Sequence, residues 1–411
     1  MAWNGWKVID MDAHIQERPA EMFGDYIDPA YREHFQRLKL ALETNVQRGL
    51  TAAVASSRYA VVAPVISDGT LGIPDSFGNV PRETVLNPTS GGGRRNFGRP
   101  DQPDLPRIRT EVSWDVAARI ADMDASFIDV DVLYPTHVSS YCALTDPGFE
   151  HALYRAYHGW VSEYCAQAPD RLKWTVVANL RDVRAGVEEL RAWAEGDLNM
   201  VGVYMPPCGP NSMLLDDPAL HPIYAAAQDL DLPILIHGGT SRPPYQPGTF
   251  DLRGAWFLQH SLSNPWAGMA AMGALIGGGI FEQFPALRVG VVETAAGWLP
   301  SILERYDAHF VLSPAHVPLL TRMPSDVVKH SGRYFHGIDT WETTLEHVVS
   351  VIGEDVLLFA TDWPHGDTAW PQAVQQVVEW PGLSDSAKRK ILGENALRLC
   401  PRLRVYATPP A

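Results

Sequence analysis

The run Met200-Val-Gly-Val-Tyr204, the helical pattern at residues 218–230 and the run Pro233-Ile-Leu-Ile-His237 together decide the fold of this chain. Each apolar, β-branched run has the length of a buried strand, and the segment between them is long enough for a helix. A strand, a helix and a second strand in this order predict a right-handed crossover between two parallel strands. The unit therefore indicates an α/β protein with a parallel sheet.

The same alternation continues on both sides of this unit. Further strands are predicted at residues 7–10, 130–134, 173–178, 287–293, 334–338 and 356–360, and further helices at residues 147–168, 184–195, 266–284 and 299–310. Eight strands joined by helices predict a closed (β/α)8 TIM barrel. A doubly wound open sheet is the alternative, but no Gly-x-Gly-x-x-Gly turn follows the first strand.

Residues 31–109 interrupt the alternation after the first strand. This segment has its own apolar run at residues 59–66, and a Pro- and Gly-rich part that includes Gly91-Gly-Gly-Arg-Arg95. Loops of this length are typical of lids, binding loops or disordered segments. We predict a barrel from residues 1–30 and 110–400, a cap from residues 31–109 over the barrel mouth, and a C-terminal tail at 401–411. A surface excursion without function is the alternative for the inserted segment.

Composition limits the possible partners. The 411 residues include 33 Lys and Arg against 48 Asp and Glu, for a net charge of −15. An acidic chain without a basic run excludes nucleic acid and an anionic membrane surface as main partners. The longest uncharged stretch, residues 254–281, contains polar side chains and Gly277-Gly-Gly279, so it is not a membrane span. The cysteines lack a Cys-x-x-Cys pair, which favours a reducing compartment. We expect a cytoplasmic homo-oligomer that acts on a small molecule.

Ionisable residues stand at the ends of three predicted strands. The first strand ends in Asp10-Met-Asp12-Ala-His14, His237 ends the fifth, and Asp362 follows the apolar run of the eighth. Alternate strand residues share a face, so Asp12 and His14 can both point toward the barrel axis. Imidazole and carboxylate ligands at one barrel face predict a site for one divalent ion, Zn²⁺ or Mn²⁺. For each residue alone, a buried structural His or a helix-capping Asp is the alternative.

Six motifs carry a family resemblance: Asp10-x-Asp12-x-His14 with Glu17 and Pro19, Tyr134-Pro-Thr136, residues 233–237, Phe284-Pro-x-Leu-Arg288, Glu293-Thr-Ala-Ala-Gly-Trp298-Leu-Pro300 and Thr361-Asp-Trp-Pro-His365. Together they resemble the amidohydrolase-related family, which includes aminocarboxymuconate-semialdehyde decarboxylase. The resemblance covers about residues 5–30 and 115–400. It implies a metal-bearing (β/α)8 barrel whose ligands are Asp12, His14, His237 and Asp362.

This chain departs from the family pattern at two positions. Asp12 stands where the decarboxylases carry His or Glu, which preserves a ligand with a shorter reach. Glu293 stands at the end of strand 6, where relatives often carry a catalytic His. A carboxylate there is a candidate general acid/base or an additional ligand, but it lacks the donor of a neutral imidazole.

Other residues are candidates for catalysis and substrate binding. The resemblance suggests that His260 faces the substrate, with packing as the alternative, and Asp362 is a candidate for catalysis as well as ligation. Arg242, five residues after His237, could pair with a substrate carboxylate. The remaining candidates for substrate binding are Tyr134, Trp298 and His365, together with Trp256 and Trp363 as possible pocket walls.

Three function classes fit these residues. The first is a metal-dependent carbon–carbon bond-cleaving enzyme, a nonoxidative decarboxylase of a small aromatic or unsaturated acid. The second is a metal-dependent hydrolase that uses a metal-activated water on a C–C, amide or ester bond, with Glu293 moving the proton. The third is a catalytically inactive binding barrel. We expect decarboxylation. Hydrolysis is the alternative, because Glu293 favours proton transfer to and from water.

Overall fold

The computed structural model describes residues 5–47, 110–136, 146–210, 213–238, 258–365 and 368–406, together with Trp3, Val138, Leu144 and Leu252. Most of the segment predicted to form a cap, and the last part of the predicted tail, lie outside the described residues. The cap and the domain boundaries therefore stay predictions. Among the described residues, no helix has both the length and the apolar character needed to cross a lipid bilayer.

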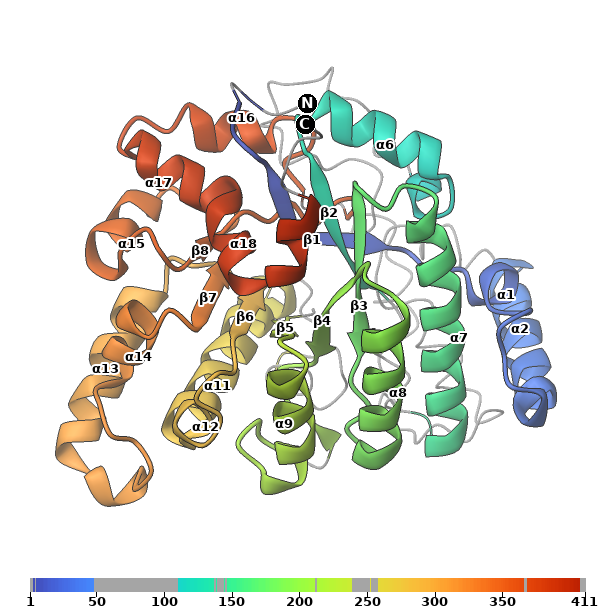
Figure 1. Cartoon of the computed structure of the whole chain (residues 1–411), viewed down its shortest axis with the longest axis horizontal. Helices are drawn as coiled ribbons and strands as arrows, with labels where there is room; N and C mark the ends of the chain where they lie inside the picture. The colour runs from blue at the N-terminus through green and yellow to red at the C-terminus, as the bar shows by residue number, and fades with distance from the viewer. Residues whose placement is uncertain are drawn as a thin grey trace.

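Eight parallel strands form one sheet in chain order (Figure 1). They are β1 (Ile9–Ile15), β2 (Val130–Pro135), β3 (Leu172–Val177), β4 (Met200–Met205), β5 (Ile234–His237), β6 (Val289–Val292), β7 (Tyr334–Gly337) and β8 (Leu357–Leu358). The first strand also bonds to the segment after the last one. Met11 N donates to Phe359 O at 2.9 Å, and Asp362 N donates to Asp12 O at 2.7 Å. The predicted (β/α)8 barrel is confirmed, and the open sheet is wrong because these bonds join its two edges.

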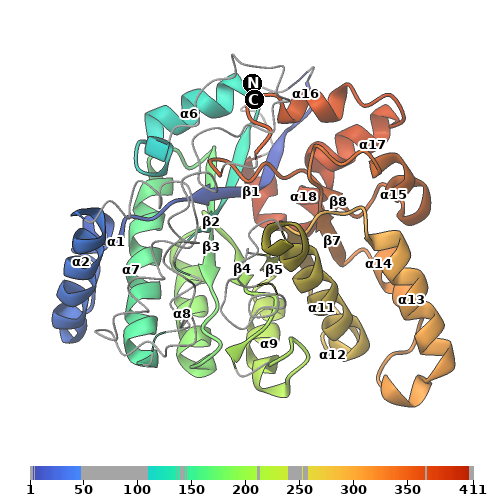
Figure 2. The ribbon, with the colours of Figure 1, turned by 180° about the vertical axis from the view of Figure 1, so that it is seen from behind.

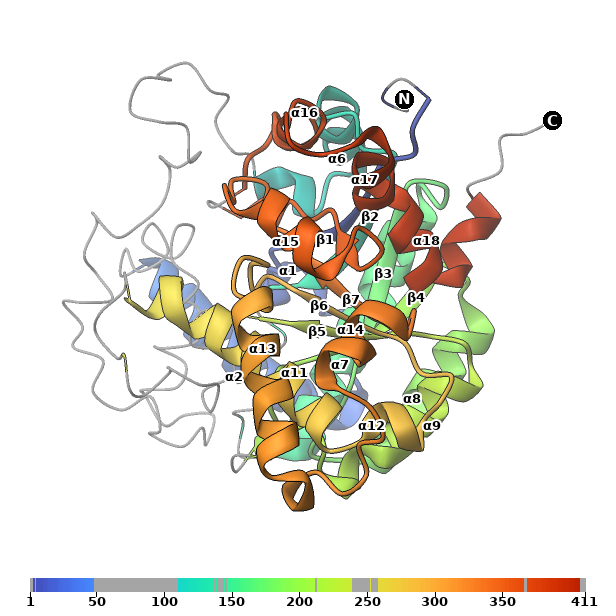
Figure 3. The same cartoon turned by 90° about the vertical axis from the view of Figure 1, so that its left-hand side faces the viewer.

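Helices surround the barrel (Figures 1 and 2). Those that follow β1 to β4 are α1 (Pro19–Met22), α2 (Arg32–Gln47), α6 (Val116–Ala125), α7 (Pro147–Ala166), α8 (Val183–Gly196) and α9 (His221–Asp229). Those that follow β5 to β7 are α11 (Asn264–Gly277), α12 (Ile280–Gln283), α13 (Leu299–Leu312), α14 (Pro324–His330) and α15 (Leu345–Ile352). After β8 come α16 (Ala373–Val378), α17 (Asp385–Arg389) and α18 (Asn395–Leu399). In Figure 3, α11 and α13 lie outside β5 and β6.

Aspartates begin several of these helices. Asp115 accepts a hydrogen bond from Ala118 N at 3.1 Å before α6, and Asp182 accepts one from Ala185 N at 3.0 Å before α8. Each bond satisfies an N–H group that the first helical turn leaves without a partner. Part of the acidic composition therefore serves to start helices.

Two predicted boundaries differ from the structure. The first strand, expected at residues 7–10, extends through Ile15, because the motif that contains Asp12 and His14 is itself paired with β2. The helix expected at residues 266–284 is broken into α11 and α12, because Gly279 has a φ of 71° that an α-helix cannot accommodate. Asp12 and His14 therefore lie within β1.

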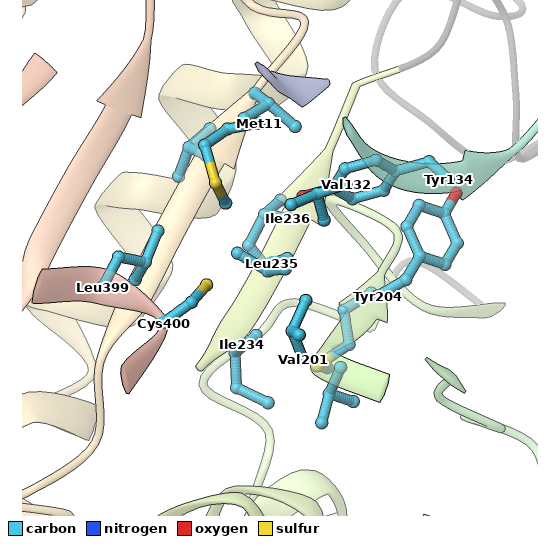
Figure 4. Close-up of a cluster of buried hydrophobic side chains, with 14 of the residues drawn as sticks. Met11, Val132, Tyr134, Val201, Tyr204, Ile234, Leu235, Ile236, Leu399 and Cys400 are labelled. Atoms are coloured by element: carbon cyan, nitrogen blue, oxygen red, sulfur yellow. The ribbon is translucent and has the colours of Figure 1, made fainter. Parts of the chain in front are cut away.

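Apolar side chains pack together in the barrel interior (Figure 4). Met11, Leu235 and Cys400 are fully buried there. Tyr134 and Tyr204 pack in the same interior, with their ring centroids 6.0 Å apart. Burying each large apolar side chain contributes about 1.5–3 kcal/mol. The barrel interior is therefore a packed apolar core that supports the strands.

A buried arginine connects α6 to the first two strands. Arg119 is fully buried and pairs with Asp131 of β2 at 3.0 Å. The same guanidinium donates to the carbonyl oxygen of His14 at 2.5 Å and to that of Val112 at 3.1 Å. Arg119 thus satisfies the buried carboxylate of Asp131 and holds the backbone of a predicted metal ligand.

We expect Arg119→Met to destabilise the protein by about 3–5 kcal/mol, because Asp131 would remain as an unpaired charge in the core. Chemical denaturation measures this loss. The matched control is Arg184→Met, because Arg184 is 83% exposed in its ion pair with Glu188. The control should change stability by less than about 0.5 kcal/mol. Equal stability of the two variants would contradict a structural role of the buried pair.

Candidate active site

Five ionisable side chains meet at the carboxyl ends of β1, β5 and β8. They form two groups that share His14: Asp12, His14 and His237 make one, and His14, Asp362 and His365 make the other. The Nε2 atoms of His14 and His237 lie 2.9 Å apart. Asp12 Oδ1 lies 2.9 Å from His237 Nε2 and 3.2 Å from His14 Nε2. Asp362 Oδ1 lies 3.1 Å from His14 Nε2.

This donor set fits a divalent metal ion. The side chains of Asp12 and His14 are each only 1% exposed, so water does not satisfy their polar atoms. Ligand atoms about 2.1 Å from one ion lie about 3.0 Å apart in adjacent octahedral positions and about 3.4 Å apart in a tetrahedral arrangement. The separations of 2.9 to 3.2 Å between these nitrogen and oxygen atoms are close to the octahedral spacing. A cation among them would satisfy lone pairs that the protein alone brings face to face.

The charges of the site favour a cation. Burial would raise the pKa of Asp12, but the charge of His237 and hydrogen bonds from His14 and His237 outweigh burial and lower it. Burial would lower the pKa of His237, but the charges of Asp12 and Glu293 raise it. The carboxylate of Asp12 is therefore ionised inside the barrel, where its field is weakly screened.

The four predicted ligands are brought to the same end of the barrel, but not as a single group of four. Asp362 joins the set through His14 and lies with His365, whose Nδ1 contacts Asp362 Oδ1. His365 was predicted to bind substrate, and its position beside Asp362 also suits it to orient that carboxylate. The assignment of Asp12, His14, His237 and Asp362 as ligands stays a prediction.

Neighbouring polar groups fix the orientation of these side chains. Thr136 Oγ1 lies 2.9 Å from His365 Nε2 and 3.4 Å from His14 Nδ1. The Thr136 N–H donates to the buried Glu17 carboxylate at 3.0 Å. Thr136 therefore contacts both imidazole rings from a position that Glu17 fixes, which is the usual role of groups behind metal ligands.

Glu293 follows β6 and lies against His237. Its Oε2 is 3.2 Å from His237 Nδ1, and its Oε1 accepts a hydrogen bond from Asn264 Nδ2 at 3.1 Å. The backbone of Glu293 has a φ of 52°, in the left-handed region. A Cβ on Gly238 would lie 2.6 Å from Glu293 O, so only glycine allows the ends of β5 and β6 to approach this closely. Glu293 thus contacts a predicted ligand from the side opposite Asp12.

The structure places some of the other residues that were predicted to bind substrate or line the pocket. The ring centroids of Tyr134 and His237 lie 5.0 Å apart. The buried hydroxyl of Tyr134 has no hydrogen-bond partner among the described residues. Trp298 donates to Thr294 O at 2.6 Å and packs against His336. Its contacts are therefore with the turn after β6 and with β7. Trp363 stacks on Trp370 in a small apolar cluster. Arg242, Trp256 and the side chain of His260 lie outside the described residues.

Two residues that contact the site, and one that binds the turn after β6, had no predicted role. Thr136 was part of a motif used for the resemblance, and its place directly after a strand could have identified it. Asn264 stands in a stretch noted only for its polar content. Glu342, described below, follows β7 in a loop, and no strand-end or metal-ligand pattern marks it.

Comparison with known proteins identifies relatives of this chain. A family model described as amidohydrolase matches residues 86–402. The chain is 24% identical over 290 residues to 2-amino-3-carboxymuconate-6-semialdehyde decarboxylase of Dictyostelium discoideum, covering 69% of this chain and 76% of that protein. It is 26% identical over 258 residues to gamma-resorcylate decarboxylase of Rhodococcus jostii, covering 58% of this chain and 73% of that protein.

Solved structures share the fold. The 5-carboxyvanillate decarboxylase of Novosphingobium aromaticivorans, crystallised with bound manganese, has a TM-score of 0.65 at 20% identity, covering 96% of this chain and 97% of that chain. The 2,6-dihydroxybenzoate decarboxylase from Rhizobium has a TM-score of 0.59 at 22% identity, covering 70% of this chain and 87% of that chain. Both likenesses agree with the barrel described above.

We expect His237→Ala to weaken metal binding by at least about 10-fold, because it removes one of the two facing imidazoles. Elemental analysis after equilibration with limiting Zn²⁺ or Mn²⁺ measures the effect. His309→Ala is the matched control, because the His309 side chain is exposed on α13 and bonds only locally to Arg305 O. A folded His237→Ala protein with unchanged metal content would exclude His237 as a ligand.

Proposed function

Because this chain belongs to the amidohydrolase family, we propose that it is a metal-dependent enzyme that cleaves a carbon–carbon bond. The proposed reaction is the nonoxidative decarboxylation of a small aromatic or unsaturated acid. The observation that carries the proposal is the donor set at the ends of β1, β5 and β8, with Glu293 3.2 Å from His237. The named decarboxylases among the relatives support this reaction over others.

The proposed ligands of one divalent ion are Asp12, His14, His237 and Asp362. Zn²⁺ and Mn²⁺ both suit imidazole and carboxylate ligands, and the manganese in the solved relative supports Mn²⁺. A divalent ion supplies Lewis acidity, which polarises the oxygen atoms of a bound acid. The buried, ionised Asp12 would contribute a negative charge to hold this ion.

Glu293 moves the proton in the proposed reaction. Its carboxylic acid gives a proton to the carbon that bears the substrate carboxylate. The bond between this carbon and the carboxylate then breaks, and its electron pair returns to the ring or double bond as carbon dioxide leaves. Glu293 regains a proton from solvent before the next turnover. The Tyr134 hydroxyl, which has no hydrogen-bond partner among the described residues, is available to donate to a substrate oxygen.

Hydrolysis remains the second candidate function. The contact of Glu293 with His237 favours it, because a carboxylate beside a metal site can take a proton from an attacking water. Hydrolysis of a C–C, amide or ester bond would use the same donor set. A small-molecule substrate, a cytoplasmic location and a homo-oligomeric state also remain proposals, and so does the absence of a nucleic-acid partner.

We expect the metal-loaded protein to release carbon dioxide from at least one acid that carries a hydroxyl beside its carboxylate, such as 2,6-dihydroxybenzoate or 5-carboxyvanillate. The assay measures carbon dioxide release and product formation, with the chelated protein as control. Parallel assays with esters and amides test hydrolysis. Hydrolysis without carbon dioxide release would replace the first proposal, and activity in neither assay would favour a binding barrel.

We expect Glu293→Gln to lower kcat by about 10²–10⁴-fold with little change in metal content, because glutamine keeps the shape and loses the proton. The control is Glu304→Gln, since Glu304 is exposed on α13. Metal content, melting temperature and turnover are measured on one preparation. Loss of metal would assign Glu293 as a ligand, loss of stability alone would assign a structural role, and unchanged turnover would remove it from the mechanism.

A further inference from the structure

The turn that carries Glu293 has an unfavourable backbone conformation. Glu293 has a φ of 52° and Ala295 a φ of 56°. Neither residue is glycine, and a left-handed conformation is unfavourable for residues that carry a Cβ atom. Such a conformation persists only where the surrounding structure holds it. The groups that bind this turn therefore determine where the Glu293 side chain points.

One buried carboxylate binds the far end of this turn. Glu342, which is 6% exposed, follows β7. Its two oxygens accept hydrogen bonds from Ala296 N, both at 2.9 Å, and Oε1 also accepts one from Gly297 N at 2.6 Å. Its Oε2 accepts another from Asp339 N at 3.0 Å. The carboxylate thus ties three backbone N–H groups from two loops together.

The contact between Glu342 and the turn leaves little space. A Cβ on Gly297 would lie 3.1 Å from Glu342 Oε1 and 2.7 Å from Thr344 Oγ1. Glycine at position 297 therefore allows the backbone N–H to reach the carboxylate. The turn is built to receive this side chain, and a bulkier residue would push the two apart.

A second group from β7 holds the middle of the turn. His336 Nε2 lies 2.8 Å from Ala295 O and 3.1 Å from Thr294 Oγ1. Its Nδ1 lies 2.8 Å from Tyr334 OH. Burial lowers the pKa of His336 to about 4, so the ring is neutral near pH 7. His336 and Glu342 therefore hold the segment after Glu293 from the neighbouring strand and the loop that follows it.

We propose that Glu342 is a positioning residue for Glu293. It holds the N–H groups of Ala296 and Gly297, which keeps the turn left-handed and the Glu293 carboxylate against His237 and Asn264. Glu342 acts through the backbone, and its own oxygens bond to N–H groups outside the ligand set. The inference rests on the proposed function only in assigning the proton transfer to Glu293.

The test replaces Glu342 with glutamine, which keeps the size but turns an N–H₂ group toward backbone donors. The first readout is the NMR signal of the Asn264 side-chain amide in the metal-loaded protein, because this amide donates to Glu293 Oε1. We expect both Glu342→Gln and Glu293→Gln to shift this signal. The control is Glu346→Gln, an exposed glutamate in the first turn of α15, which should leave it unchanged. An unshifted Asn264 signal in folded Glu342→Gln protein would overturn the proposal.

The second readout is turnover. We expect Glu342→Gln to lower kcat by about 10–100-fold with KM and metal content nearly unchanged, because small displacements of a catalytic group have effects of this size. In a Glu293→Gln background the same change should have no further effect on kcat. Equal losses in both backgrounds would overturn the proposal, since Glu342 would then act independently of Glu293. If the wild-type protein decarboxylates no tested acid, the proposed function fails, and the Asn264 signal alone still decides the positioning role.

Discussion

The structure depends on the closure of the barrel between β1 and residues 359–363. Asp362 N donates to Asp12 O at 2.7 Å, and His14 N donates to Trp363 O at 2.6 Å. These bonds join the two edges of the sheet and bring carboxylates from opposite ends of the sequence to the same imidazole. Asp10 strengthens this closure, because its carboxylate accepts a hydrogen bond from Thr361 N at 3.1 Å. Barrel closure and assembly of the site are therefore one event.

Burial makes the charged groups of the site costly to accommodate, and it strengthens their electrostatic interactions. Charged groups in the barrel interior are costly unless each has a partner. Several pairings meet this requirement. Arg119 pairs with Asp131, and the Glu17 carboxylate accepts a hydrogen bond from Thr136 N. The candidate metal ligands face one another. The same low polarity strengthens the interaction of the site with a cation and with a developing charge on the substrate.

The sequence predicts the barrel and the identity of the clustered residues well, because both follow from local patterns. The apolar pattern of a buried strand recurs eight times, and His237 stands at the end of one of these runs. The left-handed turn at Glu293 and its contact with Glu342 could not be predicted, because they depend on how two loops meet in space. Asp362 and His365 lie three residues apart in one loop, and their pairing accompanies a left-handed backbone conformation at Asp362, with a φ of 59°, that no sequence pattern marks. Position along a strand is readable from sequence, whereas contact between loops is not.

The closure of the barrel also sets the order in which the site is assembled. Pairing β1 with the segment after β8 closes the longest loop available among the strands, and such long-range contacts carry the largest entropic cost and form late. A chain still emerging from the ribosome has Asp12 and His14 long before it has Asp362. Since synthesis runs from the N-terminus, the complete donor set arises only after residue 362 has been added. The proposed metal site is thus completed by the same contacts that close the barrel.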